Sequence, residues 1–257
     1  MEIDATLWLL TALAGFAAGL IDSIVGGGGL VLTPAMLNLH PGLNILQAIG
    51  TQRTSSIMGT SVAAWNYLRK IHIERRILLP ACVAAMAASA IGVQFAKRLD
   101  PELLKWTVLA ICVILAVYTV FRKDLGLKED RRFHPKHESL AALSIGTATG
   151  FYNGLIGPGT GTIMVFAFVS FLGLDFLKSS AVSKAANVSA DISSWTVLML
   201  SGFVLWVLAV PLIIGNMLGS YIGSHMAICK GQTFVRAMFL VIVLALIARQ
   251  AWQLLTA

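Results

Sequence analysis

The chain has 257 residues, of which 57% are hydrophobic and 12% are charged, and its mean hydropathy is +0.82. Soluble globular proteins carry about 25% charged residues, so this composition excludes a soluble globule and indicates an all-α polytopic membrane protein. The formal net charge of +7 does not indicate nucleic-acid binding, because most Lys and Arg residues stand in short segments between apolar runs, where the positive-inside rule accounts for them.

The first predicted transmembrane helix covers residues 6–25 and ends at four consecutive glycines at 26–29. Each Gly costs about 1 kcal/mol of helix propensity relative to Ala, and unpaired backbone in hydrocarbon costs several kcal/mol per group. The glycines therefore predict a break that is buried in protein or lines a polar cavity. The apolar helix at 30–39 that follows reaches about half the membrane thickness, and Pro41 stops it, which predicts a discontinuous or re-entrant element.

Residues 45–68 form the next predicted helix, with a stripe of polar side chains that lipid would not face. This stripe consists of Gln47, Gln52, Arg53, Thr54, Ser55, Ser56, Thr60 and Ser61. The basic loop at 69–76 belongs in the cytoplasm by the positive-inside rule. Helices are predicted at 77–96 and 103–121, the second of them lipid-facing. Two spans separate the loop from the basic linker that ends at residue 138, so both lie on one side.

The second half repeats this order. Helices are predicted at residues 140–156, 162–172, 176–200, 204–227 and 234–252, with Gly157-Pro158-Gly159-Thr160-Gly161 as the second break and residues 230–232 as a turn. If Gly26 is placed on Gly157 and that spacing is kept throughout, the two halves align without a gap; we call this the internal alignment. Its identical pairs are Gly15/Gly146, Gly19/Gly150, Gly26/Gly157, Gly28/Gly159, Gly42/Gly173, Leu43/Leu174, Pro80/Pro211, Ser89/Ser220 and Gly92/Gly223. This pattern predicts an internal duplication, with a first repeat at 1–122, a cytoplasmic linker at 123–138 and a second repeat at 139–257.

The charge of the loops favours inverted repeats over parallel ones. The basic loop at 69–76 aligns with residues 200–207, which contain no charge. If both loops were cytoplasmic, both should be basic, so the contrast predicts that the second half is upside down relative to the first. Lys97 and Arg98 would then face outward, which counts against this orientation.

The internal alignment also pairs Asp22 with Asn153, and Arg53 with Lys184. Both cations lie about eight residues inside apolar helices, where a lone cation costs at least about 2.5–3.5 kcal/mol. One compensation is a structural ion pair with Asp22 or Asp191. The other is an anionic ligand, which the neighbouring hydroxyl and amide donors and the free N–H groups of the broken helices favour. The expected substrate-binding residues are Arg53, Lys184, Gln52, Thr54, Ser55, Ser183, Asn187, Gly27, Gly28, Gly29, Gly159 and Thr160.

Asp191 is expected either to carry a coupling proton or to balance the charge of Lys184, which lies about two helical turns earlier. The same two roles, proton coupling and charge balance, are possible for Asp22. Glycines spaced by four, Gly15 with Gly19 and Gly219 with Gly223, predict close helix packing. The glycine breaks do not fit a nucleotide-binding loop. The sequence has no metal-ligand cluster, no nucleophile and base, and no paired catalytic carboxylates, so we expect no cofactor and no enzymatic activity.

Residues 14–30, followed by Pro34 and Gly50-Thr51-Gln52-Arg53, resemble the first repeat of the TauE/SafE family of sulfite-exporter-like membrane proteins. Gly150-Phe151-Tyr152-Asn153-Gly154 with Gly157-Pro158-Gly159, and then Ser183-Lys184-Ala185-Ala186-Asn187, are similar to the second. The resemblance implies transport of small anions such as sulfite, sulfonates and related carboxylates across bacterial cytoplasmic membranes. Many members have Gly-Thr-Asn-Lys where this chain has Gly-Thr-Gln-Arg, which makes the cation bidentate, so the substrate does not follow from the family name.

We therefore expect a secondary transporter, in the direction of export, with alternating access about a site between the two repeats. It would be a multi-pass protein of the bacterial inner membrane. The membrane potential helps an anion leave by about 2.3 kcal/mol per charge per 100 mV, so export needs no obligatory ion coupling. The expected partners are a small anion and the lipid bilayer, and no nucleic acid. A homodimer is possible. The alternative is an anion channel, or a membrane-embedded sensor or scaffold without transport.

Overall fold

The computed structural model describes residues 5–96 and 129–255. Within these residues the chain forms helices and no strand, as the composition predicts. The elements are α1 (Ala5–Val25), α2 (Gly28–Leu39), α3 (Ile45–Lys70), α4 (Arg75–Ala96), α6 (Pro135–Leu155), α7 (Thr160–Ala167), the π-helix η1 (Phe168–Leu172), α8 (Phe176–Leu200) and α9 (Trp206–Leu255). The helix expected at 103–121 and the part of the linker before residue 129 lie outside the described residues.

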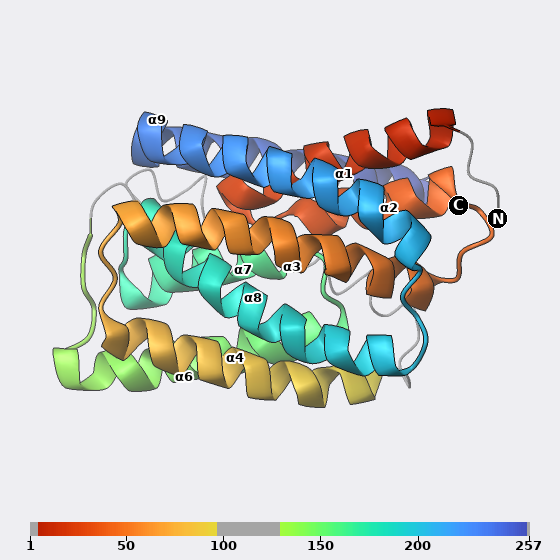
Figure 1. The fold of residues 1–257 in the computed structure, drawn as a ribbon. Helices are drawn as coiled ribbons and strands as arrows, with labels where there is room; N and C mark the ends of the chain where they lie inside the picture. The colour runs from red at the N-terminus through yellow and green to blue at the C-terminus, as the bar shows by residue number, and fades with distance from the viewer. Residues whose placement is uncertain (1–4, 97–128, 256–257) are drawn as a thin grey trace.

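The long helices lie side by side in three layers (Figure 1). One outer layer is the pair α1 and α9, the other is the pair α4 and α6, and α3 and α8 lie between them. In addition to contacting each other, α3 packs against α9 and α8 packs against α4. The polar residues in the middle of α3 and α8 are therefore buried in protein, away from the surface that lipid would touch.

Both central helices begin at side-chain caps. The Asn44 side chain accepts a hydrogen bond from the backbone N–H of Gln47 at 2.8 Å, and the Gln47 side chain accepts one from the Asn44 N–H at 3.2 Å, which is a capping box. Asp175 accepts a hydrogen bond from the N–H of Lys178 at 2.8 Å. Asn44 and Asp175 are counterparts in the internal alignment. These caps explain why both helices begin at the predicted residues.

Some predicted boundaries differ from the structure. Helix α6 begins at Pro135 rather than at residue 140, because the fixed φ of proline suits the first position of a helix. The short helices begin at Gly28 rather than at 30 and at Thr160 rather than at 162, so Gly28 and Gly29 belong to α2 and not to the first break. The last turn of the second short helix, Phe168–Leu172, is a π-helix. The turn predicted at 230–232 is present inside α9, where Gly231 has φ 77° and ψ −170°.

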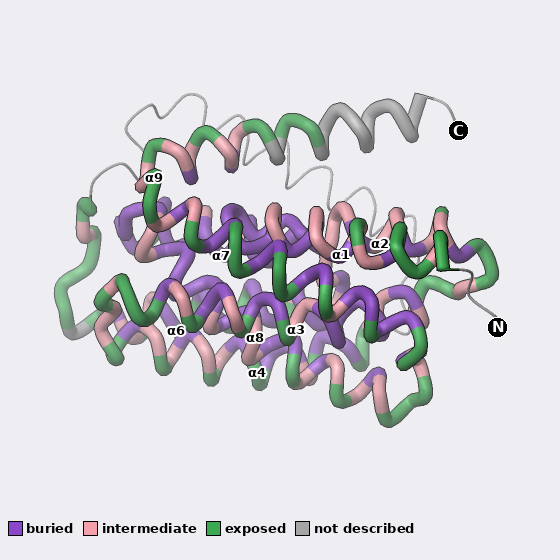
Figure 2. The backbone as a smooth tube through the Cα atoms, turned by 45° about the horizontal axis from the view of Figure 1, so that its top comes forward, coloured by how far each residue is buried: buried purple, intermediate pink, exposed green. Residues whose placement is uncertain are grey.

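Three described helical segments are long and apolar enough to cross a membrane: Ala5–Val25, Arg75–Ala96 and Trp206–Val241. Buried positions are concentrated inside the bundle, and exposed positions run along its outer helices (Figure 2). Large apolar side chains are exposed there, among them Leu9, Leu13, Leu79, Val83, Ile91 and Leu140. An apolar surface of this extent suits contact with lipid rather than with water.

Glycines bring the outer helices into close contact. A Cβ atom on Gly15 would lie 2.8 Å from a backbone oxygen of α9, and one on Gly19 would lie 2.9 Å from a Cα atom of α9. Gly219 and Gly223 of α9 face the backbone of α1 in the same way. The predicted packing role of these two spaced pairs is therefore confirmed.

Candidate functional site

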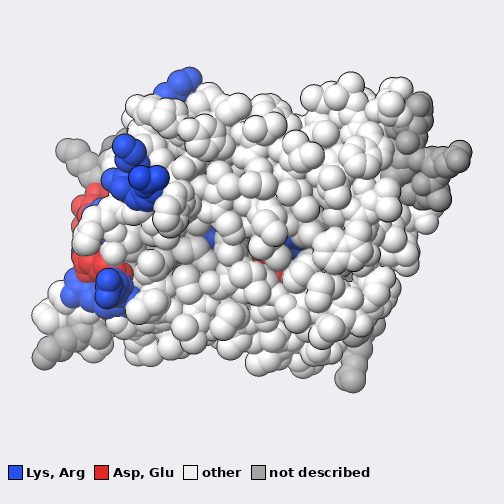
Figure 3. Space-filling model, in the orientation of Figure 1, with Lys and Arg blue, Asp and Glu red and all other residues white. Residues whose placement is uncertain are grey.

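A polar cavity lies in the central layer, between the glycine breaks that follow α1 and α6. It leaves about 30 Å³ for the centres of water molecules, and one water needs about 10–15 Å³. The cavity wall consists of Asp22, Gly26, Gly29, Gln52, Arg53, Ser56, Asn153, Gly157, Pro158, Gly159, Thr160, Gly161, Asn187 and Asp191. Figure 3 shows a few basic and acidic atoms in a depression near the middle of the face, where the surrounding surface is uncharged.

The two glycine breaks contact each other beside this cavity. The N–H of Thr162 donates a hydrogen bond to the carbonyl of Gly26 at 3.2 Å. Gly26 has φ +94°, a conformation that residues with a side chain rarely adopt. A Cβ atom on Gly161 would lie 2.6 Å from the Cα of Gly26. Gly26 is therefore needed for its backbone conformation, and Gly161 is needed for the space between the two breaks.

Lys184 is fully buried and makes an ion pair. Its Nζ lies 3.1 Å from Oδ2 of Asp22 and also donates to the backbone carbonyl of Asp22. The carboxylate accepts two further hydrogen bonds, from the N–H of Gly28 at 3.3 Å and from the hydroxyl of Thr60 at 3.1 Å. In this conformation the cation of α8 is compensated by a carboxylate of α1, which is the ion-pair alternative left open by the sequence.

Arg53 has a different environment. Its guanidinium donates to the backbone carbonyl of Asn153 at 2.6 Å and to the side-chain oxygen of Asn153 at 3.3 Å. Within the described residues Arg53 makes no ion pair. Asp191 accepts a hydrogen bond from the Asn153 amide at 2.9 Å, so the Asn153 side chain connects the cation to this carboxylate. Asn187 is the second amide here, and it accepts from the Asn153 amide at 3.1 Å.

Each of the two buried cations contacts a backbone carbonyl of the other half of the chain; we call these the crosswise contacts. Arg53 of the first half binds the carbonyl of Asn153 in the second, and Lys184 of the second half binds the carbonyl of Asp22 in the first. The internal alignment exchanges the two cations and also exchanges the two carbonyls. It aligns Thr60 with Asp191 as well. Each cation is therefore accompanied by one carboxylate, but the two carboxylates are not counterparts: Asp22 lies on α1, and Asp191 lies on α8.

The structure brings some of the predicted site residues to the cavity and leaves others outside its wall. Those in the wall are Arg53, Gln52, Asn187, Gly29, Gly159, Thr160, Asp22 and Asp191. Those outside it are Lys184, Thr54, Ser55, Ser183, Gly27 and Gly28.

The polar side chains outside the wall have partners elsewhere. Thr54 accepts a hydrogen bond from the indole N–H of Trp195 at 2.8 Å. The Ser55 hydroxyl donates to the carbonyl of Gln52 at 2.8 Å, and the Ser183 hydroxyl donates to a break carbonyl at 3.1 Å. Proximity to Arg53 in the sequence could not distinguish these residues from Gln52, because a helix turns its successive side chains to different neighbours.

The expected site residues did not include Ser56, Asn153, Gly26, Gly157, Pro158 and Gly161. The internal alignment carried a signal for three of them. Asn153 aligns with Asp22, Ser56 with Asn187 and Pro158 with Gly27, so each has an expected site residue as its counterpart.

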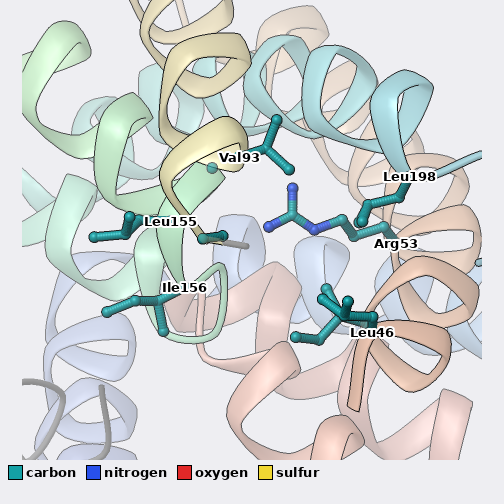
Figure 4. A pocket seen from close by; sticks show the side chains of 9 residues that line it. Leu46, Arg53, Val93, Leu155, Ile156 and Leu198 are labelled. Carbon is teal, nitrogen blue, oxygen red and sulfur yellow. The ribbon is translucent and has the colours of Figure 1, made fainter. Parts of the chain in front are cut away.

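A second, mainly apolar pocket lies on another side of Arg53 (Figure 4). Leu46, Val93, Ile156 and Leu198 are among the side chains that surround its guanidinium there. Arg53 therefore separates a polar cavity from an apolar one, and its guanidinium faces both.

Charged side chains also gather at one end of the bundle (Figure 3). Arg131 binds Glu138 at 2.8 Å and Glu74 at 3.1 Å, and both Arg131 and Lys178 bind Glu129. This network connects the loop after α3, the segment before α6 and the first turn of α8. Burial alone would raise the pKa of Glu129, but the hydrogen bonds from Lys178 and Arg131 hold it below the usual value.

The comparisons with known proteins agree with this architecture. Residues 11–249 match the family described as "Sulfite exporter TauE/SafE". A protein of Haemophilus influenzae named "Probable membrane transporter protein" is 30% identical, over 98% of each chain. "Probable membrane transporter protein ORF9" of a Sinorhizobium species is also 30% identical, over 92% of this chain and 89% of its own. "Probable membrane transporter protein YfcA" of Escherichia coli is 27% identical, over 92% and 85%.

No solved structure matches the chain. The family match covers most of the sequence, including both glycine breaks and both buried cations. The protein therefore belongs to the TauE/SafE family of membrane transporters.

Proposed function

We propose that the chain is a secondary transporter of small anions, such as sulfite, organosulfonates or related carboxylates, and that the central cavity is its binding site. The observation that carries this proposal is Arg53, a buried guanidinium in a polar cavity with an amide rather than a carboxylate as its partner. A cation in this environment is available to an oxyanion, for which bidentate hydrogen bonds are favourable. The size of the cavity suits a head group of a few atoms.

Arg53 would neutralise the anion, and Gln52, Ser56 and Asn187 would donate hydrogen bonds to its oxygens from the same wall. Lys184 would keep its partner Asp22 and hold α8 against α1. This assignment narrows the expectation from the sequence, in which both cations bind the anion.

The proposal includes inverted repeats with one re-entrant helix pair in each. The pairs α1 with α9 and α6 with α4 occupy equivalent places in the two outer layers, and the caps, the breaks and the crosswise contacts of the two cations all follow the internal alignment. Alternating access would come from movement of the two repeats relative to each other about the cavity.

We place the protein in the bacterial cytoplasmic membrane as a multi-pass protein, with the charged end of Figure 3 in the cytoplasm. The segments at that end carry most of the described basic residues, whereas residues 40–44 and 201–205, which connect helices at the other end, contain no Lys or Arg. The positive-inside rule assigns the basic end to the cytoplasm.

Flux of sulfite and of 2-hydroxyethanesulfonate through proteoliposomes tests the proposal. We expect saturable flux of at least one of them in the wild type. Arg53→Met should lower it by about 10- to 100-fold, because hydrogen bonds to charged groups contribute about 1.5–3 kcal/mol. Arg69→Met is the matched control, since Arg69 lies on the same helix with its side chain exposed, and its flux should equal that of the wild type.

Flux that does not saturate would indicate a channel, and no flux of any small anion would indicate a sensor or scaffold. Saturable flux that Arg53→Met leaves unchanged would place the anion site elsewhere.

A further inference from the structure

We propose that Asp191 takes up one proton for each anion that binds in the central cavity, so that anion and proton move together. This inference rests on the proposed function and adds the coupling ion to it. It chooses the coupling proton from the two roles that the sequence left open for Asp191, and it differs from the expectation that export needs no obligatory ion coupling.

The first step is a count of charge. The two cations of the site, Arg53 and Lys184, are matched by two carboxylates, Asp22 and Asp191, and all four are at least nine-tenths buried. Without an anion the site is therefore neutral when all four groups are ionised. A bound monoanion adds one uncompensated negative charge in a buried place, which is strongly unfavourable. One proton restores neutrality.

The second step identifies the carboxylate that takes the proton. Asp22 has a direct ion pair with Lys184 and two further hydrogen-bond donors, so protonating it would leave Lys184 buried and unpaired. Among the described residues, the side chain of Asp191 has only amide partners, Asn153 at 2.9 Å and Asn187 at 3.5 Å. Loss of its charge removes no direct ion pair.

The third step concerns the anion itself. Asp191 and Arg53 are both in the wall of the same small cavity, so an anion bound to Arg53 lies close to Asp191. A neighbouring negative charge favours the protonated form of a carboxyl group. The protonated group also becomes a hydrogen-bond donor, whereas the carboxylate is only an acceptor. The proton thus turns a repulsive neighbour of the anion into a binding group.

The other groups around Asp191 do not offer a better proton acceptor. Its charged neighbours in the described structure are Arg53 of α3, Asp22 of α1 and Lys184 of its own helix. Ser89 of α4 donates to the carbonyl of the preceding residue, Ala190, and Asn153 of α6 donates to Asp191 itself; both side chains are neutral.

The experiment uses the wild-type chain in proteoliposomes with labelled 2-hydroxyethanesulfonate, a strong-acid anion whose own charge does not change with pH. Sulfite is unsuitable here because it exchanges a proton near neutral pH. With an inward proton gradient of one pH unit and no membrane potential, we expect about tenfold accumulation of the anion, as one-to-one electroneutral coupling requires. A potassium diffusion potential without a proton gradient should give no accumulation.

Two variants assign the proton to its residue. Asp191→Asn should no longer accumulate the anion in response to the proton gradient, and its flux should respond to the potential instead. Asp175→Asn is the matched control, because Asp175 is a buried carboxylate at the start of the same helix and asparagine caps a helix equally well. It should behave as the wild type does.

A binding measurement in detergent covers the case in which Asp191→Asn gives no flux. Addition of the anion to the folded wild type should remove about one proton per site from a weakly buffered solution with a pH dye, and addition to folded Asp191→Asn should remove none. Equal proton uptake by the two proteins would overturn the assignment.

The remaining outcomes separate this inference from the proposed function. Saturable wild-type flux that follows the potential and ignores the proton gradient would overturn the inference and leave the transporter intact. A proton-driven flux that persists in Asp191→Asn would overturn the role of Asp191. Absence of saturable flux of any tested anion would overturn the proposed function and the inference with it.

Discussion

The buried pair of Lys184 and Asp22 should stabilise the fold as a unit rather than as two independent residues. Lys184→Met leaves a carboxylate that is 7% exposed without its cation, and Asp22→Asn leaves a fully buried ammonium without its carboxylate. Removing one partner of a buried pair costs about 3–5 kcal/mol. For a chain of this size, 1 kcal/mol shifts the Tm by about 2–4 °C, so each single variant should lose roughly 6–20 °C.

The double variant, Asp22→Asn with Lys184→Met, should be more stable than either single variant. It leaves no unpaired charge, and replacing a buried ion pair by neutral groups of similar volume is often close to neutral. The assay is thermal unfolding of the purified protein in detergent, with intrinsic fluorescence as the signal. The matched control is Lys178 with Glu129, a pair whose side chains are each 28% exposed, for which a coupling of only about 0–1 kcal/mol is expected.

The same double variant tests the role of Lys184 in transport. If Lys184 only pairs with Asp22, the double variant should retain saturable flux. If it folds and has no flux, Lys184 binds the anion directly. Single-variant losses in Tm that simply add in the double variant would refute the reasoning, because they would mean that the two charges do not depend on each other.

Three further predictions concern other parts of the structure. Gly19→Ala should cost about 1–3 kcal/mol through overpacking, since its Cβ would overlap the backbone of Asn216 in α9. Gly42→Ala, with no atom within 4 Å of the added Cβ, should leave the Tm unchanged, and an equal loss in both variants would contradict the packing argument. The pKa of Glu129 is depressed in the folded state, so its ion pairs stabilise the fold above pH 4.5, and this contribution is lost as the pH falls from 4.5 through the lower folded-state pKa. Glu129→Gln should therefore reduce the loss of Tm between pH 7 and about pH 3, and a loss as large as that of the wild type would refute this. Asn153→Asp should give Arg53 a carboxylate partner and abolish anion flux while the protein stays folded, and undiminished flux would show that the guanidinium is not the anion's ligand.

Much of the fold followed from the sequence because its determinants are local. The caps at Asn44 and Asp175 and the glycines at 26–29 each act within a few residues, and the predicted helix starts at 45 and 176 are confirmed. The start of α6 was placed too late because the polar residues after Pro135 were assigned to the linker, although the proline itself is a favourable first residue of a helix.

The candidate site was harder to predict, because it depends on which side chains meet across the bundle. The sequence placed Asp22 and Asp191 as rival partners of the two cations, but nothing local decides that Lys184 reaches Asp22 directly while Arg53 is connected to Asp191 through Asn153. Thr54 and Ser55 were chosen because they adjoin Arg53 in the chain, yet both bond elsewhere.

The crosswise contacts have a consequence for how the protein is made. A ribosome delivers Asp22 and Arg53 to the membrane long before Lys184 and Asn153 emerge, so the first half is inserted while the partners of its buried charges do not yet exist. Until the second half emerges, Arg53 lacks the carbonyl of Asn153, and Asp22 has its hydrogen bonds from Gly28 and Thr60 but not the ammonium of Lys184. The first half alone is therefore expected to be a short-lived species, and separately encoded halves should survive only when both are expressed in the same cell.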